Sequence, residues 1–373
     1  MKGESKIRVL MDHQTFEKQR FGGISRYFYE LAGRMKNVET VIPLRFSVNQ
    51  YLAGSGLADF HIPPVWFYKM MKAHFKRFNL RHIQKVLETT DFDVFHPTYY
   101  DPYFLPLMGN RNFVLTIHDM THERFPQYFS PRDKTPEHKR LLAERATRII
   151  AISENTKRDI VDLLHVNPEK IDVIYHGHDA PTVPLQDHKT LGLPEKYLLY
   201  VGERRGYKNF GSTLKAFCQI RQTHPEIHLV LTGKKLSKNE RNDMKTLGVS
   251  AFVHCFSDVN DHRLAQLYRH AVAFVYPSYY EGFGIPILEA WAQKCPVALA
   301  KASCFTEVAE DAAVYFEPEN VEEQAEVLLQ LIENKELTEK LISRGVERLQ
   351  LFSWENTARL TEETYYKTLT SKS

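Results

Sequence analysis

The sequence has few of the features that mark a membrane, secreted or nucleic-acid-binding protein. No apolar run reaches the roughly 18 residues of a membrane-spanning helix, and the opening residues, MKGESKIRVLMDH, lack the apolar core of a signal peptide. The net charge of +3 is too small to indicate a nucleic-acid partner. The four cysteines have neither metal-ligand nor disulfide-framework spacing. We therefore expect a cytoplasmic protein with reduced thiols that binds no nucleic acid.

Two common phosphate-binding motifs are missing as well. The G-x-G-x-x-G dinucleotide fingerprint is absent, and Gly233-Lys234-Lys235 lacks the flanking residues of a P-loop. His176 and His178 form a pair that suggests a metal, but the sequence places no third ligand near them. We therefore expect no metal and no other resident cofactor.

What the chain does have is length, together with a regular alternation of short apolar segments and helical patterns. Its 373 residues exceed the usual size of a single core, so two domains are expected. The alternation predicts parallel sheets with helices on both faces in each half. Residues 180–196 contain three prolines and no helical period, which favours a linker. The expected domains are residues 1–180 and 181–354, followed by a last helix over 355–373.

The most informative stretch is residues 271–300, AVAFVYPSYYEGFGIPILEAWAQKCPVALA. Its first residues predict a buried strand, and a helix is expected from about Ile285. In the loop between them, Gly282-Phe283-Gly284 can turn tightly and present main-chain N–H groups to an anion such as a phosphate. Glu281 and Glu289 can both border the same pocket. Taken singly, each piece is more often an ordinary turn or helix start than a site.

A second chemically suggestive loop is Val201–Asn209, VGERRGYKN. A strand is expected to end at Gly202, and a helix to begin just after Lys208. An arginine fork at Arg204 and the point charge of Lys208 suit the binding of a diphosphate. Exposed loop cations are more often simply solvated, so this loop alone favours no function.

Two features of the N-terminal half are similar in kind. Gly22-Gly23 separates an expected strand, Ile7–Met11, from a helical pattern and could cradle an anion, although a plain turn is the commoner explanation. His118 follows the expected strand Phe113–Ile117. The carboxyl ends of strands in open α/β sheets are where ligands bind, but a lone His is more often structural.

Together these motifs resemble the large family 4 of retaining glycosyltransferases (GT4). Residues 281–290, EGFGIPILEA, match the family's EGFG(L/I)P-x-LEA signature with its paired glutamates. The 201–209 loop resembles its diphosphate-binding loop, and Thr116–Asp119 resembles its T-x-H-D motif. Lys294-Cys295 departs from the usual Cys-Gly, and Thr306 replaces a usual proline. The resemblance covers nearly the whole chain and is most specific over 198–320.

This resemblance implies the GT-B fold, in which two Rossmann-like, doubly wound domains face each other across a cleft. The nucleotide-sugar donor would lie mainly on the C-terminal domain and the acceptor on the N-terminal one, with the last helix packing back on the N-terminal domain. Roles are implied residue by residue. Glu289 would hold the ribose hydroxyls, Glu281 would approach the donor sugar, and His118 would orient that sugar. The remaining donor contacts would be Gly22, Gly23, Gly202, Arg204, Lys208, Gly282, Phe283, Gly284 and Ile285.

The chemistry that such an enzyme must perform is cleavage of an anomeric C–O bond, which leaves negative charge on a nucleoside diphosphate. Fixed cations and amides can stabilise that charge without a metal, and Arg204 and Lys208 are the expected cations. Retention of configuration is implied by the family. The closest pattern is that of bacterial polysaccharide-assembly enzymes, including mannosyltransferases, so GDP-mannose is the expected donor, with UDP-sugars next. The acceptor would be a glycan or a lipid-linked oligosaccharide.

Residues 61–87 form an unusual basic and aromatic stretch. Six Lys or Arg residues are interleaved with seven aromatic or Met residues, and no Asp or Glu intervenes. Such a helix can lie on an anionic membrane, which would place the protein peripherally on the inner face of the membrane. A solvated basic helix that packs its apolar face on the domain core explains the pattern at least as well.

Two other functions fit parts of the sequence. A second GT-B enzyme, such as a nucleotide-sugar epimerase or a phosphorylase, would share the donor site. A non-catalytic module that binds a nucleotide sugar would share it too, although the intact glutamates and cations argue against a decayed site.

Overall fold

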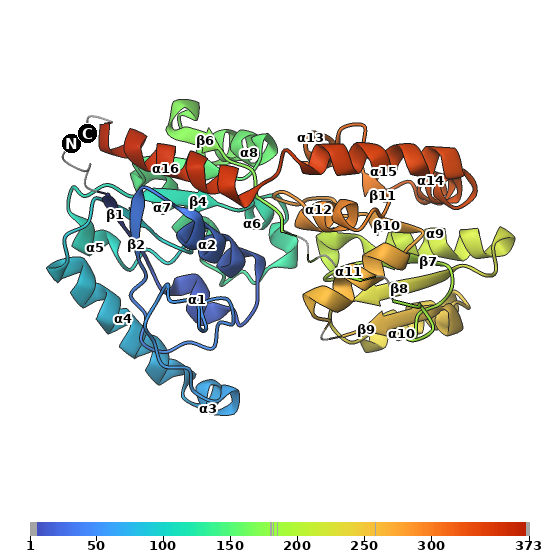
Figure 1. Cartoon of the computed structure of the whole chain (residues 1–373), viewed down its shortest axis with the longest axis horizontal. Helices are drawn as coiled ribbons and strands as arrows, with labels where there is room; N and C mark the ends of the chain where they lie inside the picture. Colours follow the sequence, from blue (N-terminus) through green and yellow to red (C-terminus); the bar gives the residue numbers. More distant parts are fainter. Residues whose placement is uncertain (1–5, 180, 182, 185, 258, 371–373) are drawn as a thin grey trace. The chain divides into compact units, whose positions relative to one another are not determined.

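The computed structural model describes residues 6–179, 181, 183–184, 186–257 and 259–370, and it divides into two compact units (Figure 1). Unit 1 comprises residues 1–177 and 353–373, and unit 2 comprises residues 178–352. The domain boundaries predicted from the sequence are 180/181 and 354/355. Residues 180, 182 and 185 of the expected linker lie outside the described residues. Each unit is considered by itself below.

The described residues of unit 1 form six parallel strands in two three-stranded groups, β2-β1-β3 and β4-β5-β6. A single parallel bridge between Phe95 and Phe113 joins the two groups. The strands are β1 (Ile7–Met11), β2 (Val38–Val41), β3 (Val94–His96), β4 (Val114–Ile117), β5 (Arg148–Ala151) and β6 (Ile171–Val173). β3 and β4 are buried along their whole length, as expected of parallel strands covered on both faces.

The helices of unit 1 follow the strands in an alternating order. They are α1 (Gln14–Lys18), α2 (Gly23–Arg34), α3 (Val65–Met70), α4 (Lys72–Thr89), α5 (Leu105–Met108), α6 (Thr121–Arg124), α7 (Thr135–Arg145), α8 (Glu154–Leu164) and α16 (Trp354–Thr370). Short 3₁₀ turns lie at Pro126–Tyr128 and Pro168–Lys170. Helix α8 is capped by Ser153, whose hydroxyl accepts a hydrogen bond from the Thr156 amide.

The last helix, α16, is part of unit 1 and packs along α2 (Figure 1). Trp354 at its start is 2% exposed, and Gly177 lies so close that a Cβ there would be 2.1 Å from the Trp354 nitrogen. Further along the helix, the buried Tyr365 hydroxyl lies 2.7 Å from His96 Nδ1. The C-terminal segment therefore completes the core of the N-terminal unit.

Unit 2 contains one six-stranded parallel sheet in the order β12-β11-β10-β7-β8-β9. Its strands are β7 (Tyr197–Tyr200), β8 (His228–Thr232), β9 (Val253–Phe256), β10 (Ala273–Tyr276), β11 (Val297–Ala300) and β12 (Val314–Phe316). The strand order reverses between β7 and β10. In open α/β sheets ligands bind outside the carboxyl ends of the strands at that switch point.

The helices of unit 2 are α9 (Phe210–Thr223), α10 (Lys238–Thr246), α11 (Asp261–His270), α12 (Ile285–Ala292), α13 (Phe305–Ala309), α14 (Val321–Glu333) and α15 (Lys335–Leu349). Two 3₁₀ turns lie at Gly206–Lys208 and Ser250–Phe252. Helices α14 and α9 pack on each other, as do α15 and α12. The buried Trp291 of α12 faces Gly345 of α15, where even a methyl group would meet the indole.

The basic stretch of residues 61–87 forms α3, α4 and the segment before them. Helix α4 buries Phe75, Asn79, Ile83 and Leu87, which recur with helical period and face the unit. No helix in the described part of the chain is long and apolar enough to cross a membrane.

Candidate active site

The two loops singled out in the C-terminal half lie side by side at the switch point of unit 2. One follows β7 and carries Gly202, Arg204 and Lys208, and the other follows β10 and carries Glu281 to Gly284. The Tyr279 amide donates to the Tyr207 carbonyl oxygen at 2.9 Å, which joins the loops directly. The topology therefore brings together residues that are some 75 positions apart in sequence.

The centre of this site is an ion pair between Lys208 and Glu281. Lys208 Nζ lies 2.6 Å from Glu281 Oε1, and the side chains are 18% and 13% exposed. The same carboxylate oxygen accepts a hydrogen bond from the Ser278 hydroxyl at 2.8 Å. The pair is partly exposed, so an anionic ligand that enters the site can compete with Glu281 for the ammonium group.

The main chain around Glu281 is held by Ser303. The Ser303 hydroxyl donates to the Glu281 carbonyl at 2.7 Å and lies 3.2 Å from the Glu281 amide. The Cys304 thiol also lies 3.2 Å from that carbonyl. This double contact fixes the loop in which the Gly282, Phe283 and Gly284 amides lie.

Gly284 ends that loop in a left-handed conformation, with φ of 95°, as the residue just before α12. A residue with a side chain adopts this conformation only with strain, which explains the glycine at this position. Helix α12 then begins at Ile285, so its amino end points at the loop and favours an anion. The Phe283 ring is buried against Phe352, so only its main chain can serve a ligand.

Glu289 lies in the second turn of α12 and is partly exposed. The buried Tyr268 hydroxyl donates to its Oε2 at 3.2 Å. This hydrogen bond orients the carboxylate. That Glu281 and Glu289 border one pocket stays a prediction.

Arg204 differs from the expectation of an exposed cation beside a diphosphate. Its side chain is 3% exposed, and its Nε donates to Glu240 Oε1 at 2.6 Å. Its two terminal nitrogens donate to the carbonyl oxygens of Thr232 and Lys234. In the described part of the chain these are its hydrogen-bond partners, and none belongs to the loop after β10. The guanidinium is buried because it joins two neighbouring turns.

A cavity of about 570 Å³ opens over the carboxyl ends of β7, β8 and β9. It begins at Gly202, the residue that also starts the loop of Lys208. Its lining is Gly202, Glu203, Thr232, Gly233, Lys234, Lys235, Ser257, Val259 and Leu264. Sequence reasoning did not predict this cavity, because its residues come from three separate turns with no shared motif.

In unit 1, His118 follows β4 and is 7% exposed. Its ring stacks parallel to that of His176 at 6.1 Å and meets the Tyr27 ring edge-on at 5.2 Å. Burial lowers the pKa of His118 to about 4, although Asp119 opposes that shift. The imidazole is therefore neutral at pH 7 and can exchange hydrogen bonds with an uncharged ligand.

Gly22 and Gly23 lie at the start of α2, as expected. The carbonyl of Gly22 accepts hydrogen bonds from the Arg26 amide and the Ser25 hydroxyl. The Gln19 side chain accepts from the Ser25 amide at 3.1 Å. A Cβ on Gly22 would lie 2.2 Å from that Gln19 side chain, so close approach explains the first glycine.

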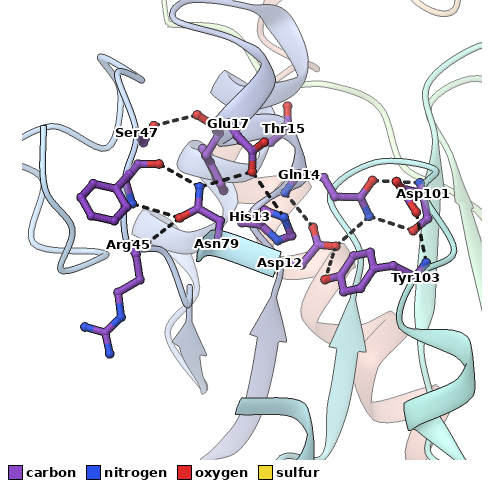
Figure 2. A network of polar contacts seen from close by, with 12 residues as sticks. Asp12, His13, Gln14, Thr15, Glu17, Arg45, Ser47, Asn79, Asp101 and Tyr103 are labelled. Carbon is purple, nitrogen blue, oxygen red and sulfur yellow. Dashed lines mark hydrogen bonds and ion pairs between the residues drawn. The ribbon is translucent and has the colours of Figure 1, made fainter. Parts of the chain in front are cut away.

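Figure 2 shows a buried polar network at the carboxyl ends of β1 and β3, which sequence reasoning missed. Asp12 is fully buried, and its carboxylate accepts hydrogen bonds from the Thr98 amide and hydroxyl, from Gln14 and from the Tyr103 hydroxyl. Because these donors satisfy the carboxylate, Asp12 locks the loop after β1 to the loop after β3. The signal was an Asp directly after a buried strand.

The same network continues toward α4. Glu17 of α1 lies 3.4 Å from His13 Nε2, and the Asn79 amide donates to it at 3.2 Å (Figure 2). The sequence predicts that the chain passes directly from β1 to a glycine loop. In the structure α1 intervenes, and this contact ties it to α4. Within the described residues, no group of three or more His, Cys, Asp or Glu side chains could hold a metal ion.

Two family descriptions match the chain one after the other. "Glycosyltransferase Family 4" matches residues 21–180, and "Glycosyl transferases group 1" matches residues 185–348. Together they span most of both units.

Curated relatives point the same way. O-antigen chain mannosyltransferase B of Escherichia coli is 27% identical over 73% of this chain and 74% of its own length. O-antigen chain mannosyltransferase RfbU of Salmonella typhimurium is 28% identical over 58% of this chain and 59% of its own length.

Two solved structures share the fold over nearly the whole chain. Anabaena Alr3699/HepE in complex with UDP-glucose has a TM-score of 0.76 at 18% identity, over 97% of this chain and all of that one. Sucrose-phosphate synthase from Thermosynechococcus elongatus has a TM-score of 0.75 at 18% identity, over 97% of this chain and 99% of that one.

Proposed function

Because this chain belongs to the glycosyltransferases of family 4 and has the GT-B fold, we propose that it transfers a sugar with retention from a nucleoside-diphosphate sugar to a hydroxyl of a glycan. The observation that carries this proposal is the Lys208–Glu281 pair at the switch point of unit 2, beside the amino end of α12. A cation and aligned main-chain amides at one point form a site for a diphosphate.

In the proposed reaction the bond between the anomeric carbon and the β-phosphate oxygen breaks, and its electron pair leaves with the nucleoside diphosphate. Lys208 and the amides of Gly282 to Gly284 stabilise that charge, and each contact contributes about 2–4 kcal/mol in the transition state. The acceptor oxygen attacks the same face of the sugar. Its proton passes to the departing phosphate oxygen, so no covalent enzyme intermediate forms.

The other expected site residues take the roles that the family resemblance gives them. Glu289 holds the ribose hydroxyls, and the cavity over β7, β8 and β9 holds the nucleoside. Glu281 exchanges its contact with Lys208 for one with the donor sugar. His118, neutral at pH 7, offers an uncharged imidazole to the sugar, and the start of α2 at Gly22-Gly23 serves the donor phosphates and the acceptor.

We also propose that Lys208 and the loop amides suffice to stabilise the negative charge of the leaving group, so that transfer needs no metal. GDP-mannose is the proposed donor because two similar proteins are O-antigen chain mannosyltransferases. A UDP-sugar is the next candidate, since a protein of similar fold was solved with UDP-glucose. A nucleotide-sugar donor and a glycan acceptor are the substrates of polysaccharide assembly, which is therefore the proposed process.

A membrane-borne acceptor fits the surface of α3 and α4. Lys69, Lys72, Lys76, Arg77, Arg81 and Lys85 are all exposed there. Three apolar side chains on the same helices, Trp66, Met70 and Phe78, are 54–69% exposed. Cations interleaved with exposed apolar groups suit an anionic lipid surface. We propose that these helices hold the enzyme peripherally at the inner membrane face, where a lipid-linked glycan would be extended.

The test of the proposed function is a transfer assay. The enzyme is incubated with GDP-, UDP- or dTDP-sugars, with and without a lipid extract as acceptor, and the products are identified by mass spectrometry. Consumption of one donor that requires the acceptor supports transfer. Conversion of the donor to an isomer without acceptor would identify an epimerase, and binding without conversion would identify a non-catalytic module.

A further inference from the structure

Both basic side chains expected at the diphosphate are paired with carboxylates, but in different ways. Lys208 meets Glu281 at the accessible centre of the site. Arg204 meets Glu240 at a buried position, with the two side chains 3% and 18% exposed. This difference in burial indicates that the two cations have different functions.

The guanidinium of Arg204 holds the turn after β8 from both sides. Its terminal nitrogens donate to the carbonyl oxygens of Thr232 and Lys234, the residues on either side of Gly233. A Cβ on Gly233 would lie 2.6 Å from the Gly202 carbonyl oxygen and 3.6 Å from Arg204 Nη1. The turns after β7 and β8 are therefore in close contact, and Arg204 is the side chain that joins them.

Glu240 fixes the third nitrogen of Arg204 and ties it to α10. Its Oε1 accepts from Arg204 Nε at 2.6 Å, and its Oε2 accepts from the Ser237 amide at 2.6 Å. The Ser237 hydroxyl in turn caps α10 by accepting from the Glu240 amide. One carboxylate thus links the Arg204 fork to the start of a helix.

The turns after β7 and β8, which Arg204 joins, both line the 570 Å³ cavity. Arg204, Ser237 and Glu240 themselves line a smaller neighbouring pocket of about 230 Å³, which shares Glu203, Lys234 and Lys235 with that cavity. We propose that Arg204 and Glu240 form a clamp that sets the shape of the larger cavity, and that Arg204 is a positioning residue for the nucleoside of the donor. The inference rests on the proposed function, because it takes the cavity as the nucleoside site. It assigns the leaving diphosphate to Lys208 and the loop amides alone.

One substitution distinguishes the clamp from an alternative, in which Arg204 binds the phosphates of the nucleotide and Glu240 restrains it. The two roles predict opposite changes in the affinity for a nucleoside diphosphate. If Glu240 restrains Arg204, Glu240→Gln frees the guanidinium and tightens nucleoside-diphosphate binding. If the pair is a clamp, Glu240→Gln loosens the cavity and weakens binding about tenfold or more, since small misplacements of a site are costly.

Unit 2 contains a matched control. Arg348 also donates to two carbonyl oxygens, those of Glu307 and Val308, and pairs with the Glu310 carboxylate at 2.7 Å. None of these residues lines the cavity. Glu310 is more exposed than Glu240, at 61% against 18%. Glu310→Gln removes an arginine–carboxylate contact from the same unit and should leave nucleotide binding unchanged.

The experiment is calorimetric titration of the whole protein with the mono- and diphosphates of uridine, guanosine and thymidine. We expect Glu240→Gln and Arg204→Lys to weaken the binding of the preferred nucleoside's monophosphate and diphosphate by the same factor, because the clamp acts on the nucleoside. A lysine cannot reach three acceptors, so the retained charge should not rescue binding.

Tighter binding in Glu240→Gln, or a loss confined to the diphosphate, would overturn the clamp. Equal weakening in Glu310→Gln would overturn it too, because the effect would then be one of general stability. If the wild-type protein binds none of the six nucleotides, the proposed function itself fails, and the clamp fails with it.

Discussion

Lys208 and Glu281 show that the residues of a site can be predicted from the sequence although their geometry cannot. Both residue types could be named because each stands in a loop that follows an apolar strand. Their 2.6 Å contact depends on the neighbouring positions of β7 and β10, which no local pattern encodes. Arg204 illustrates the opposite case. Its loop position suggested an exposed cation. Two of its three acceptors lie at the turn after β8 and the third is Glu240 of α10, so only the tertiary structure shows that it is buried.

At the same scale, three buried histidines of unit 1 make its stability depend on pH. Burial lowers the pKa of His96 to about 3 and that of His118 to about 4, and it lowers that of His176 well below the ordinary value of 6.5. The unfolded chain therefore binds protons below pH 6.5 that the folded chain does not bind. Stability is complete above about pH 6.5 and falls as the pH drops toward 4.

Each of these histidines should lower the free energy of unfolding by up to about 1.4 kcal/mol per pH unit in that window. Urea unfolding of the protein between about pH 7.5 and 5 measures this slope. The variant His118→Asn should show a shallower slope than the wild type. A free energy of unfolding that stays constant across this range would contradict the neutral, buried state of these side chains.

At the scale of elements, the sequence predicted most strands and helices because burial and capping are local signals. The run from Ile7 to Met11 and the helix starting at Phe210 are both confirmed. Helix α1 was missed, because it is only five residues long and is fixed by nonlocal contacts, such as that between Glu17 and Asn79. The Asp12 network was missed for the same reason.

The packing of α15 on α12 gives a prediction about the helix that carries Glu289. A Cβ on Gly345 would lie 2.3 Å from Trp291 Cδ1, so Gly345→Ala should destabilise the protein by about 1–3 kcal/mol through overpacking. Gly211 in α9 has open space around its Cβ position, so Gly211→Ala should be neutral or stabilise by up to about 1 kcal/mol. Thermal unfolding compares the two variants, and equal effects would contradict the predicted contact.

The helices α3 and α4 give a second prediction at this scale. The double variant Lys72→Gln/Lys76→Gln should bind vesicles containing about 30% anionic lipid at least tenfold more weakly, since each cation contributes about 1 kcal/mol near such a surface. Trp66→Ala should also weaken binding, and salt should weaken the binding of the wild type. Cosedimentation with vesicles measures each effect.

The control for this surface is Lys335→Gln/Lys340→Gln, a pair of exposed lysines on α15. It should bind vesicles as the wild type does. The membrane proposal is contradicted if both double variants lose the same affinity. Retained vesicle binding in the Lys72/Lys76 variant would contradict it as well.

At the scale of the whole molecule, the chain forms two units with parallel sheets, and each sheet has a switch point. The residues at the two switch points differ. In unit 2 that point carries the cation, carboxylates and amides of the proposed donor site. In unit 1 the corresponding loops after β1 and β3 are locked by a satisfied buried carboxylate, Asp12. The fold of both units was predictable from alternation and motif, whereas the contents of each switch point were not.

The central claim is that Lys208 and the amides beside it hold the terminal phosphate of the donor nucleotide. It is tested most directly by calorimetric titration of the wild type and Lys208→Ala with the mono- and diphosphate of the preferred nucleoside. We expect the wild type to bind the diphosphate about tenfold or more tightly than the monophosphate, and Lys208→Ala to lose most of that preference while it still binds the monophosphate. An undiminished preference for the diphosphate in Lys208→Ala would contradict the account.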